Sequence, residues 1–338
     1  MMMPLTSISK PLIVVLNWNG KYDTIKCVES LRNQSLTPTI LVIDNGSKDD
    51  SVATLRAHFN EDIILIEHPK NLGFTGGVNA GISYAIDNGF QSVALFNNDA
   101  VADKNWLKEL VKQLDKATIV TSLLLNESGD KIDSTAEMYS NWGMPFPRSR
   151  GDNTSSAPSS GYVFAATGGA TLYKTSLFKQ IGLFDESFFA YYEDVDISFR
   201  AQLAGHKIYY TKDAIAYHKQ GATSKKIPGF TVYQTFKNIP LLYTKNVPTS
   251  LLIPIGLRLF VLYWLIFGNA VRKGSGIPAL RGWLASIWHF WTKSLWNRFS
   301  IQSKKTVPTS YIKSLIWYDL PPEQTGLRKL RSKFTGKN

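Results

Sequence analysis

The sequence predicts an α/β fold, in which helices flank a mostly parallel sheet, followed by a basic helical C-terminal region. Over residues 10–220, short apolar runs that read as buried strands alternate with helix-like segments. Several of these runs end in polar residues, as strands do at the ligand-binding edge of an open α/β sheet. Beyond residue 220 the chain changes to longer apolar, Trp-rich segments. We therefore expect two regions, 10–220 and 221–338.

Charge separates the same two regions. Residues 221–338 carry 18 Lys and Arg against 2 Asp and Glu, whereas residues 1–220 carry 20 against 24. This asymmetry predicts an anionic partner for the C-terminal region alone, either a membrane surface or nucleic acid. No recognised nucleic-acid-binding module accompanies the charge, so we expect no nucleic-acid partner.

The single cysteine and the start of the chain bear on location. Cys27 is the only cysteine, which rules out an intrachain disulfide and a cysteine zinc cluster. Met1 to Lys10 lacks the apolar core of a secretory signal, and Leu12 to Leu16 is too short to be one. We expect the cytoplasmic face of a membrane.

The first strand is predicted over 12–16 and ends in the turn Asn17-Trp-Asn-Gly20. A helix over 24–31 and a second strand over 40–43 follow, and this strand ends at Asp44. Strand, helix and strand imply a right-handed parallel unit. At a strand's carboxyl end, Asp44 can accept an N–H from a base or a hydroxyl from a ribose. A plain Asx turn is the alternative.

A third strand over 63–66 leads to a glycine-rich loop over 71–81 that runs into a helix. Glycines let backbone amides approach phosphate oxygens, and a helix amino end favours anions. The spacing of Gly73, Gly76 and Gly77 is neither the dinucleotide fingerprint nor a P-loop, which disfavours NAD and ATP. Close packing of the helix on a strand is the alternative.

The next strand, over 93–99, ends in two amides and a carboxylate. Asp99 can offer a hard oxygen ligand to Mg²⁺ or Mn²⁺, while Asn97 can bond a phosphate or sugar. The alternative is that these residues cap a helix over 106–114. A further strand is predicted over 119–125.

Residues 126–160 are rich in Ser, Asn, Gly and Pro, and predict an irregular, partly mobile excursion near the site. Strand character returns over 164–173 around Gly168-Gly169, where small residues let a sugar or a backbone come close.

The densest polar cluster follows four aromatic residues at 188–192. Glu193 and Asp194 stand together behind this aromatic wall, which could keep a carboxylate poised as a base. Asp196 and Arg200 predict a structural i,i+4 ion pair. The alternative for the whole cluster is that its acids only stabilise the amino end of a helix. His218 ends the last predicted strand; a lone His is usually structural, unless it shares a metal with Asp99.

Together these segments resemble the inverting GT-A (Rossmann-like) glycosyltransferases of family 2, and most the rhamnosyltransferase-like members that build bacterial surface polysaccharides. The resemblance covers about residues 10–220 in collinear order. It rests on Asn17-Trp-Asn-Gly, Asp44-Asn-Gly-Ser, Asn71-Leu-Gly-Phe with Gly76-Gly-Val-Asn79, Asn97-Asn-Asp99, Gly168-Gly-Ala, Phe184 to Asp196, Arg200 and His218.

The resemblance implies a role for each matching position. Asp194 corresponds to the catalytic base, and Asp99 and His218 to the metal or diphosphate ligands. Asn97 stands where the D-x-D motif has its first acid, a substitution common among rhamnosyl-type members. Positions expected to bind the nucleotide-sugar are Asn17, Asp44, Asn71, Gly73, Gly76, Asn79, Asn97 and Asn98, and those on the acceptor side are Gly168, Gly169 and Glu193.

The implied chemistry is one displacement at the anomeric carbon. Asp194 would take the proton of an acceptor hydroxyl, and Mg²⁺ or Mn²⁺ on Asp99 would neutralise the leaving diphosphate. The expected donor is a dTDP- or UDP-linked sugar, and the acceptor a lipid-linked or other saccharide. The processive signature Gln-x-x-Arg-Trp is missing before Arg200, so we expect the addition of one sugar, or a few.

The C-terminal region predicts contact with a membrane. Residues 251–268 are apolar except for Arg258, and a charge at the centre of a span costs about 2.5–3.5 kcal/mol, so an in-plane helix is favoured over a single span. An aromatic-rich helical face is predicted at Leu284, Ile287, Trp288, Trp291 and Leu295, flanked by Arg281, Lys293 and Arg298. An ordinary helical subdomain packed on the sheet is the alternative.

Two rival functions stay open at this stage. A sugar-nucleotide pyrophosphorylase would share the sheet and the metal, but its basic glycine loop has no counterpart in Asn17-Trp-Asn-Gly20. A non-catalytic, membrane-bound nucleotide-sugar sensor would tolerate loss of Asp194. Because all motifs precede residue 221, we also expect a chain ending near residue 240 to keep its donor site.

Overall fold

The computed structural model of the chain describes residues 10–219, 227–322, 324–326 and 328. The expectation for Met1 to Lys10 therefore lies almost wholly outside the described residues, and the expected boundary near 220 falls beside the gap at 220–226. The strands are β1 (Leu12–Asn17), β2 (Thr39–Asp44), β3 (Ile64–Glu67), β4 (Ser92–Asn97), β5 (Ala100–Ala102), β6 (Ile119–Asn126), β7 (Ile132–Ser134), β8 (Glu137–Tyr139), β9 (Pro145–Pro147), β10 (Gly161–Tyr162), β11 (Ala170–Lys174) and β12 (Ile208–His218). The α-helices are α1 (Lys21–Arg32), α2 (Ser51–Phe59), α3 (Gly73–Asp87), α4 (Trp106–Val111), α5 (Thr175–Ile181), α6 (Glu193–Leu203), α7 (Phe230–Asn246), α8 (Thr249–Arg272), α9 (Gly276–His289), α10 (Leu295–Ser303) and α11 (Thr309–Leu315).

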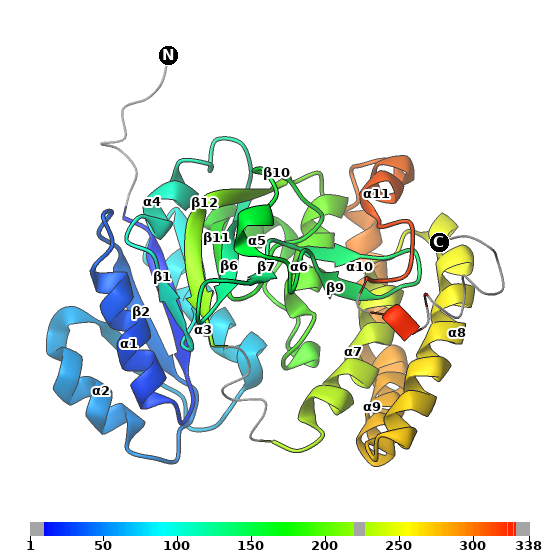
Figure 1. Cartoon of the computed structure of the whole chain (residues 1–338), viewed down its shortest axis with the longest axis horizontal. Helices are drawn as coiled ribbons and strands as arrows, with labels where there is room; N and C mark the ends of the chain where they lie inside the picture. The colour runs from blue at the N-terminus through cyan, green and yellow to red at the C-terminus, as the bar shows by residue number, and fades with distance from the viewer. Residues whose placement is uncertain (1–9, 220–226, 323, 327, 329–338) are drawn as a thin grey trace.

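Four strands form the parallel half of the main sheet, in the order β3-β2-β1-β4. Their central residues are apolar because helices cover both faces. In β1, Leu12 and Val14 pack with α3, whereas Ile13 and Val15 pack with α1, α2 and α4. The sheet and the helices that cover it are adjacent layers in Figure 1. The predicted α/β layers are confirmed.

The other half of the sheet is mixed, so the expectation of a mostly parallel sheet is wrong there. β11 runs antiparallel to both β4 and β6, while β12 is parallel to β6. A parallel connection needs a crossover, usually a helix, and the chain reaches β11 from the 126–160 excursion, which contains no α-helix. The strands expected over 208–210 and 214–218 are one strand, β12, whose pairing with β6 shifts between Thr211 and Ile215.

The excursion over 126–160 is more regular than its composition predicts. β7 extends the main sheet by pairing with β6, and β8 and β9 form a separate antiparallel pair. The turn between β8 and β9 lies against α8, since a Cβ added to Gly143 would come within 3.0 Å of Leu259. This hairpin therefore joins the sheet to the C-terminal helices.

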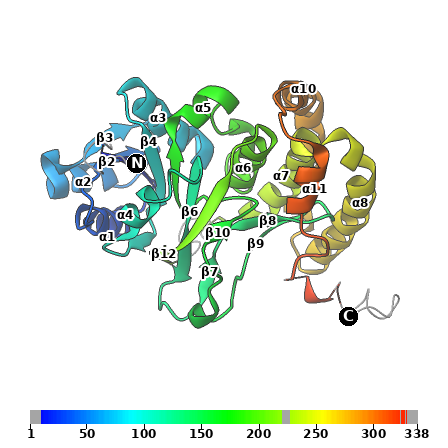
Figure 2. The ribbon, with the colours of Figure 1, turned by 90° about the horizontal axis from the view of Figure 1, so that it is seen from above.

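The C-terminal helices form a layer beyond the β8–β9 hairpin, on the side away from β1 to β3 (Figure 2). Pro240 lies inside α7 and has no N–H for the carbonyl of Phe236. The hydroxyl of Tyr263 on α8 donates to that carbonyl at 2.8 Å. α9 approaches α7 closely at Gly282, where a Cβ would stand 2.4 Å from the Tyr233 carbonyl oxygen.

The expected aromatic face over 284–295 is interrupted by a π-helical segment, Phe290–Ser294. Because this segment turns more slowly than an α-helix, Leu295 is half-buried and Trp296 is exposed in its place. Trp288 and Trp291 are exposed as predicted. Within the described residues, α8 is the one helix long and apolar enough to cross a bilayer, a property that core helices can share.

Candidate active site

A cavity of about 830 Å³ opens along the carboxyl ends of β1 and β4. Its opposite wall is built by β9 and by the segment 189–194 that leads into α6. The start of α7 closes one side through Phe230, Thr231 and Thr235. Among the residues expected at the site, those that line this cavity are Asn71, Gly73, Asn97, Asn98, Asp99, Gly168, Gly169, Glu193, Asp194 and His218.

Strand pairing brings Asp99 and His218 together across 119 residues of sequence. β5 pairs with the end of β12, so that His218 stands opposite Ala100, and the Asp99 carboxylate lies 3.0 Å from His218 Nε2. On the other side of the ring, Nδ1 lies 2.7 Å from the carboxylate of Asp133 on β7. Sequence reasoning missed Asp133, because the excursion that carries it gives no motif.

The His218 imidazole is held between two carboxylates. Burial lowers the pKa of His218, but hydrogen bonds to Asp133 and Asp99 outweigh it and raise the pKa to about 9. Arg150 in turn pairs with Asp133 at 3.0 Å and donates from Nε to its carbonyl oxygen. Arg150 also lines the cavity, where it adds positive charge that sequence reasoning missed as well.

The donor set at this edge fits a divalent cation that is shared with a substrate. Among the described residues there is no group of three or more His, Cys, Asp and Glu side chains arranged to hold a metal. Asp99 and His218 Nε2 could supply two ligands once Nε2 gives up its proton to the incoming cation's solvent, with Asp133 orienting the imidazole from behind as carboxylates do at metal sites. Mg²⁺ commonly takes one or two carboxylates and completes its shell with phosphate and water.

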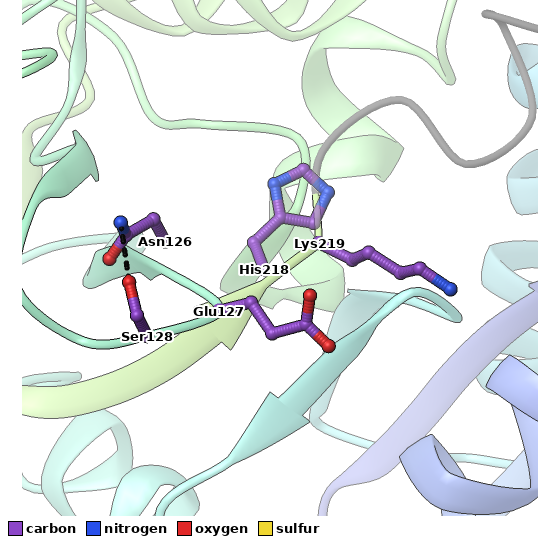
Figure 3. Close-up of a pocket in the computed structure, with 5 residues that line it drawn as sticks. All are labelled: Asn126, Glu127, Ser128, His218 and Lys219. Atoms are coloured by element: carbon purple, nitrogen blue, oxygen red, sulfur yellow. Dashed lines mark hydrogen bonds between the residues drawn. The ribbon is translucent and has the colours of Figure 1, made fainter.

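His218 also lines a second, more open hollow of about 380 Å³ at the carboxyl ends of β6 and β12 (Figure 3). Its other lining residues are Asn126, Glu127, Ser128 and Lys219. The Lys219 ammonium is already paired with Asp23 on α1 at 3.1 Å. The imidazole is therefore reachable from two sides.

Asp44 and Asn17 lie at adjoining strand ends but not in the cavity lining. The buried Asp44 carboxylate accepts from Asn17 Nδ2 at 2.7 Å and from the backbone N–H and hydroxyl of Ser47. Asn17 Oδ1 accepts from the Thr24 hydroxyl on α1. The bonded N–H is three residues after Asp44, one residue further than in the Asx turn that was the alternative. The role in base binding stays a prediction.

The glycine-rich segment is helical from Gly73 onward, so the expected loop is shorter than predicted. Asn71 Oδ1 accepts from the Gly73 N–H, and both residues line the cavity. Gly76 packs on Leu72 instead, and Asn79 bonds the backbone of Phe184 through both its amide atoms. Gly76 and Asn79 therefore support the helix in this structure, and their nucleotide-binding role stays a prediction.

Small residues let the β4 end and the β11 approach meet closely. A Cβ on Gly169 would stand 3.1 Å from Asn97 Nδ2, and the Gly169 carbonyl accepts from the Asn97 N–H. Asn97 Nδ2 also lies 3.3 Å from His218 Nε2. Asn98 donates to the Thr24 hydroxyl at 3.0 Å. The two amides thus frame Asp99 from either side.

Asp194 is fixed at the amino end of α6. One carboxylate oxygen accepts from the Gly168 N–H and the other from the Val195 N–H, both at 2.8 Å. Burial raises the pKa of Asp194 despite these two hydrogen bonds. Burial and the Asp194 charge raise the pKa of the neighbouring Glu193 to about 8. A carboxylate that is buried, oriented and open to a cavity has the geometry of a general base.

A further carboxyl group, Glu137 on β8, lines the same cavity. Burial and the nearby Asp194 hold the pKa of Glu137 well above its usual range, although Arg150 opposes this. Sequence reasoning missed Glu137 because it lies in the excursion. Its presence concentrates acidic groups on the wall opposite the strand ends.

The segment before Asp194 is strained. Phe189, Tyr191 and Tyr192 have φ values of 62°, 71° and 69°. For a residue other than glycine, the left-handed region costs about 1–2 kcal/mol. Such a segment persists only when its surroundings hold it, and strained backbone of this kind often marks a functional site.

Helix α7 supplies part of this support, which the sequence analysis did not foresee. Lys237 and Asn238 bond backbone carbonyls of the strained segment. Lys245 pairs with Asp185 and Asp196, and Asn246 donates to Asp196. The expected ion pair between Asp196 and Arg200 is present at 2.9 Å. The signal that could have revealed α7 was two Lys-Asn pairs eight residues apart in a helix with no other charged residue.

These contacts argue against the expectation that a chain ending near residue 240 keeps its donor site. Such a chain would lose Lys245 and Asn246 and would leave the carboxylates of Asp185 and Asp196 buried without them. Uncompensated buried charge is strongly destabilising.

A polar strand edge and a buried carboxylate that face one cavity define an α/β protein with an enzyme-like site. The chain belongs to glycosyl transferase family 2: the family described as "Glycosyl transferase family 2" matches residues 12–182. The protein is accordingly a glycosyltransferase, and the rhamnosyltransferase-like subtype expected above stays a prediction.

Known proteins agree with this assignment. The "Low-salt glycan biosynthesis hexosyltransferase Agl10" of Haloferax volcanii is 27% identical over 235 residues, which cover 67% of this chain and 73% of the relative. A mannosyltransferase of Pyrobaculum calidifontis, in complex with GDP-Man and Mn²⁺, superposes with a TM-score of 0.53 at 14% identity, covering 90% of this chain and 88% of that one.

Two further solved structures share the fold. S. aureus TarS 1-349 in complex with UDP-GlcNAc gives a TM-score of 0.54 at 14% identity, over 92% of this chain and 93% of that one. GalNAc-T7 with UDP, GalNAc and Mn²⁺ gives 0.51 at 16% identity, over 62% of this chain, which spans 43% of that protein. At these identities the likeness establishes the mixed α/β fold with its curled sheet, and not the substrate.

Proposed function

We propose that the protein is an inverting, metal-dependent glycosyltransferase that moves one sugar from a nucleoside-diphosphate sugar to a saccharide acceptor. The single observation that carries this proposal is Asp194, a buried carboxylate held by two backbone N–H groups and open to the cavity opposite the strand ends. A base and diphosphate ligands that line the same cavity suit a direct displacement.

In this mechanism Asp194 takes the proton of the acceptor hydroxyl as the oxygen attacks the anomeric carbon. The raised pKa of Asp194 brings its basicity closer to the operating pH, which favours proton transfer. Attack from the Asp194 side expels the nucleoside diphosphate on the other side. One displacement of this kind inverts the anomeric configuration.

A divalent cation, Mg²⁺ or Mn²⁺, would be held by Asp99 and His218 and would neutralise charge on the leaving diphosphate. Asp133 keeps the His218 ring in place through Nδ1, and Asn97 approaches the same ring from β4. Two of the structural neighbours contain Mn²⁺, which supports a metal in this family of folds.

The donor is proposed to be a UDP- or dTDP-linked hexose, with rhamnose as a candidate. The neighbours hold UDP-GlcNAc, GDP-Man or UDP, which supports a nucleotide-sugar as the ligand class. Asn71 and Gly73 face the cavity at the start of α3, where backbone amides and a helix amino end favour a diphosphate.

We further propose that the acceptor is lipid-linked and that the protein works on the cytoplasmic face of a membrane, in surface-polysaccharide synthesis. The outer surface of α8 to α10 is apolar: Ile253, Trp288 and Trp296 are 76%, 70% and 72% exposed. Contiguous apolar surface of this kind marks a membrane or protein contact. The basic residues Arg258, Arg272, Lys273, Arg281 and Lys293, all exposed, add attraction to anionic lipid.

The position of this surface supports an in-plane arrangement. α8 packs on α7 through Tyr263 and on the β8–β9 hairpin through Leu259, so one of its faces is already occupied by protein. Met144 of the hairpin lines the cavity and belongs to the same apolar cluster as Leu259. The wall of the cavity that Met144 lines, where we propose that the acceptor binds, therefore lies next to the helices that would contact lipid.

The two rival functions are weaker on these observations. Membership of family 2 favours transfer over pyrophosphorolysis. A non-catalytic sensor would not need a buried carboxylate that is oriented by two N–H groups at 2.8 Å.

A thermal-shift screen of sugar nucleotides with Mn²⁺ would identify the donor, and the selected compound would then be assayed for transfer. We expect one class of nucleotide-sugar to raise the melting temperature in a metal-dependent way. Incubation of UDP- and dTDP-sugars with pyrophosphate serves as the counter-assay. Release of nucleoside triphosphate there, without transfer to any saccharide, would favour the pyrophosphorylase instead.

A further inference from the structure

Helix α7, which lies outside the part of the chain that the family matches, holds the strained segment before Asp194. It does so through hydrogen bonds to the backbone of that segment. Asn238 Nδ2 on α7 lies 3.1 Å from the carbonyl oxygen of Phe188 and 2.8 Å from those of Ala190 and Tyr191. Lys237 Nζ donates to the carbonyls of Ser187 and Phe188 at 2.8 and 3.1 Å. α7 therefore bonds four of the five consecutive carbonyl groups of residues 187–191.

The chemistry of Asn238 matches this task. Its side chain is fully buried, and its amide nitrogen faces three carbonyl oxygens, which fixes the amide orientation. Among the described residues, its Oδ1 has no hydrogen-bond partner. A buried acceptor without a partner is unfavourable, so the benefit of this residue lies in its N–H groups.

On its other side, the same segment contacts the start of α3, at the edge of the cavity where the donor is proposed to bind. The Phe189 carbonyl accepts from the Thr75 N–H on α3 at 3.2 Å. A Cβ added to Gly73 would stand 2.5 Å from that carbonyl oxygen. The segment thus lies between α3 and α7, and the carbonyl groups that α7 holds are two to six residues before Glu193.

We propose that Asn238 is a positioning residue of the transfer step: by bonding the carbonyls of Phe188, Ala190 and Tyr191, it holds the left-handed turn that places Asp194 against the donor. This inference rests on the proposed role of Asp194 as the base. Asn238 itself exchanges no proton and does not line the cavity. Its loss should slow the reaction without preventing the donor from binding.

The test compares Asn238→Leu, which keeps the branched shape and the number of heavy atoms of the side chain and removes both N–H groups, with Leu262→Ala. Leu262 is a fully buried residue of α8 whose truncation lowers stability through a cavity. Amide hydrogen exchange of the full-length protein is measured by mass spectrometry over 186–196. Binding of UDP with Mn²⁺ is measured by calorimetry, and kcat and KM are measured with the donor that the screen selects.

We expect Asn238→Leu to speed exchange over 186–196 and to lower kcat by about 10²-fold, as a misplacement near 1 Å can do, with donor KM and UDP affinity within twofold of wild type. Leu262→Ala should lower the melting temperature and leave kcat unchanged. Asn238→Ser, which restores one donor in a smaller side chain, should recover part of kcat and serves if Asn238→Leu does not fold.

Unchanged exchange and unchanged kcat in the folded Asn238 variants would overturn the inference. So would equal losses of kcat in Asn238→Leu and Leu262→Ala, since that pattern reports stability alone. The proposed function fails separately: if Asp194→Asn keeps wild-type turnover, the base is misassigned, whatever the Asn238 variants do.

Discussion

The sheet region and the C-terminal helices place their polar and apolar residues in opposite ways. Around the sheet, apolar side chains such as Val14 and Leu41 fill the interior, and polar groups gather at the strand ends. In the C-terminal helices, Lys237, Asn238 and Lys245 are buried, while α8 to α10 expose a row of large apolar side chains. The second region therefore buries polar side chains beside its apolar core and leaves large apolar side chains at its surface.

The difference shows what each region faces. A strand edge with polar groups suits a water-soluble, charged donor. The buried cations in α7 satisfy carbonyls and carboxylates of the neighbouring segment around Asp194. An exposed apolar surface is favourable only when something apolar covers it, which we propose to be lipid. The polar strand edge, the buried network of α7 and the exposed apolar surface can each be tested separately.

The largest expected effect is on turnover. Asp194→Asn keeps the shape of the side chain but removes the base, so we expect kcat to fall by about 10²–10⁴-fold. Calorimetry with UDP and Mn²⁺ should give an affinity close to wild type, because Asp194 bonds backbone N–H groups and is not one of the proposed metal ligands. Normal turnover in this variant would show that the buried carboxylate has only a structural role.

The buried ion pairs of α7 should dominate stability. Lys245→Met leaves Asp185 and Asp196 without their shared cation, and breaking one partner of a buried pair costs about 3–5 kcal/mol. Urea unfolding would measure this loss, with the exposed Lys108→Met as a control expected to stay within about 0.5 kcal/mol. Equal midpoints for the two variants would mean that α7 packs without this network.

The same network gives stability a defined pH dependence. Although burial raises it, Lys245 and the bonds from Ser187 hold the pKa of Asp185 below its ordinary value of 3.8. A carboxyl group with a depressed folded-state pKa stabilises the protein above its ordinary pKa, and this contribution is lost as pH falls through the folded-state value. Wild type should therefore lose more stability between pH 5 and pH 3 than Lys245→Met does, as measured by thermal melts across that range.

Metal binding should depend on the residues behind the ligands as well as on the ligands. Asp99→Ala should remove the Mn²⁺ dependence of UDP binding, and His218→Ala should weaken it. Asp133→Asn should lower the apparent Mn²⁺ affinity by about 10–100-fold, as loss of a partner that orients a histidine ligand does. If calorimetry showed the same Mn²⁺ dependence for Asp99→Ala as for wild type, the metal assignment would be wrong.

Membrane binding should have a salt-sensitive and a salt-resistant part. Exposed charges are screened within about 8 Å at physiological ionic strength, so high salt should weaken binding to anionic vesicles. The double variant Trp288→Ser/Trp291→Ser should remove most of the salt-resistant part, since a buried aromatic side chain contributes about 1.5–3 kcal/mol. Tyr22→Ser, at an exposed aromatic of α1, is the matched control. Flotation that is insensitive to both tryptophans would assign the surface to another partner.

The sequence predicted the parallel half of the sheet and the residues at its strand ends. An apolar run that closes with polar residues, as the run before Asn97 and Asp99 does, is a local signal. The sequence also predicted a strand at β11 but not its antiparallel direction, which depends on how the distant excursion returns to the sheet. Asp133 and Glu137 were missed for the same reason, since only the pairing of β6 with β7 and the closure of the cavity bring them to the site. The role of α7 is a tertiary property that helical periodicity does not contain.

The central claim is a single displacement with Asp194 as the base, and the configuration of the product tests it most directly. The donor chosen by the screen is incubated with Mn²⁺ and a saccharide acceptor, and the one-bond carbon–hydrogen coupling at the new anomeric centre is read by NMR. We predict the anomeric configuration opposite to that of the donor, formed by wild type and not by Asp194→Asn. A product that retains the donor configuration would contradict the mechanism.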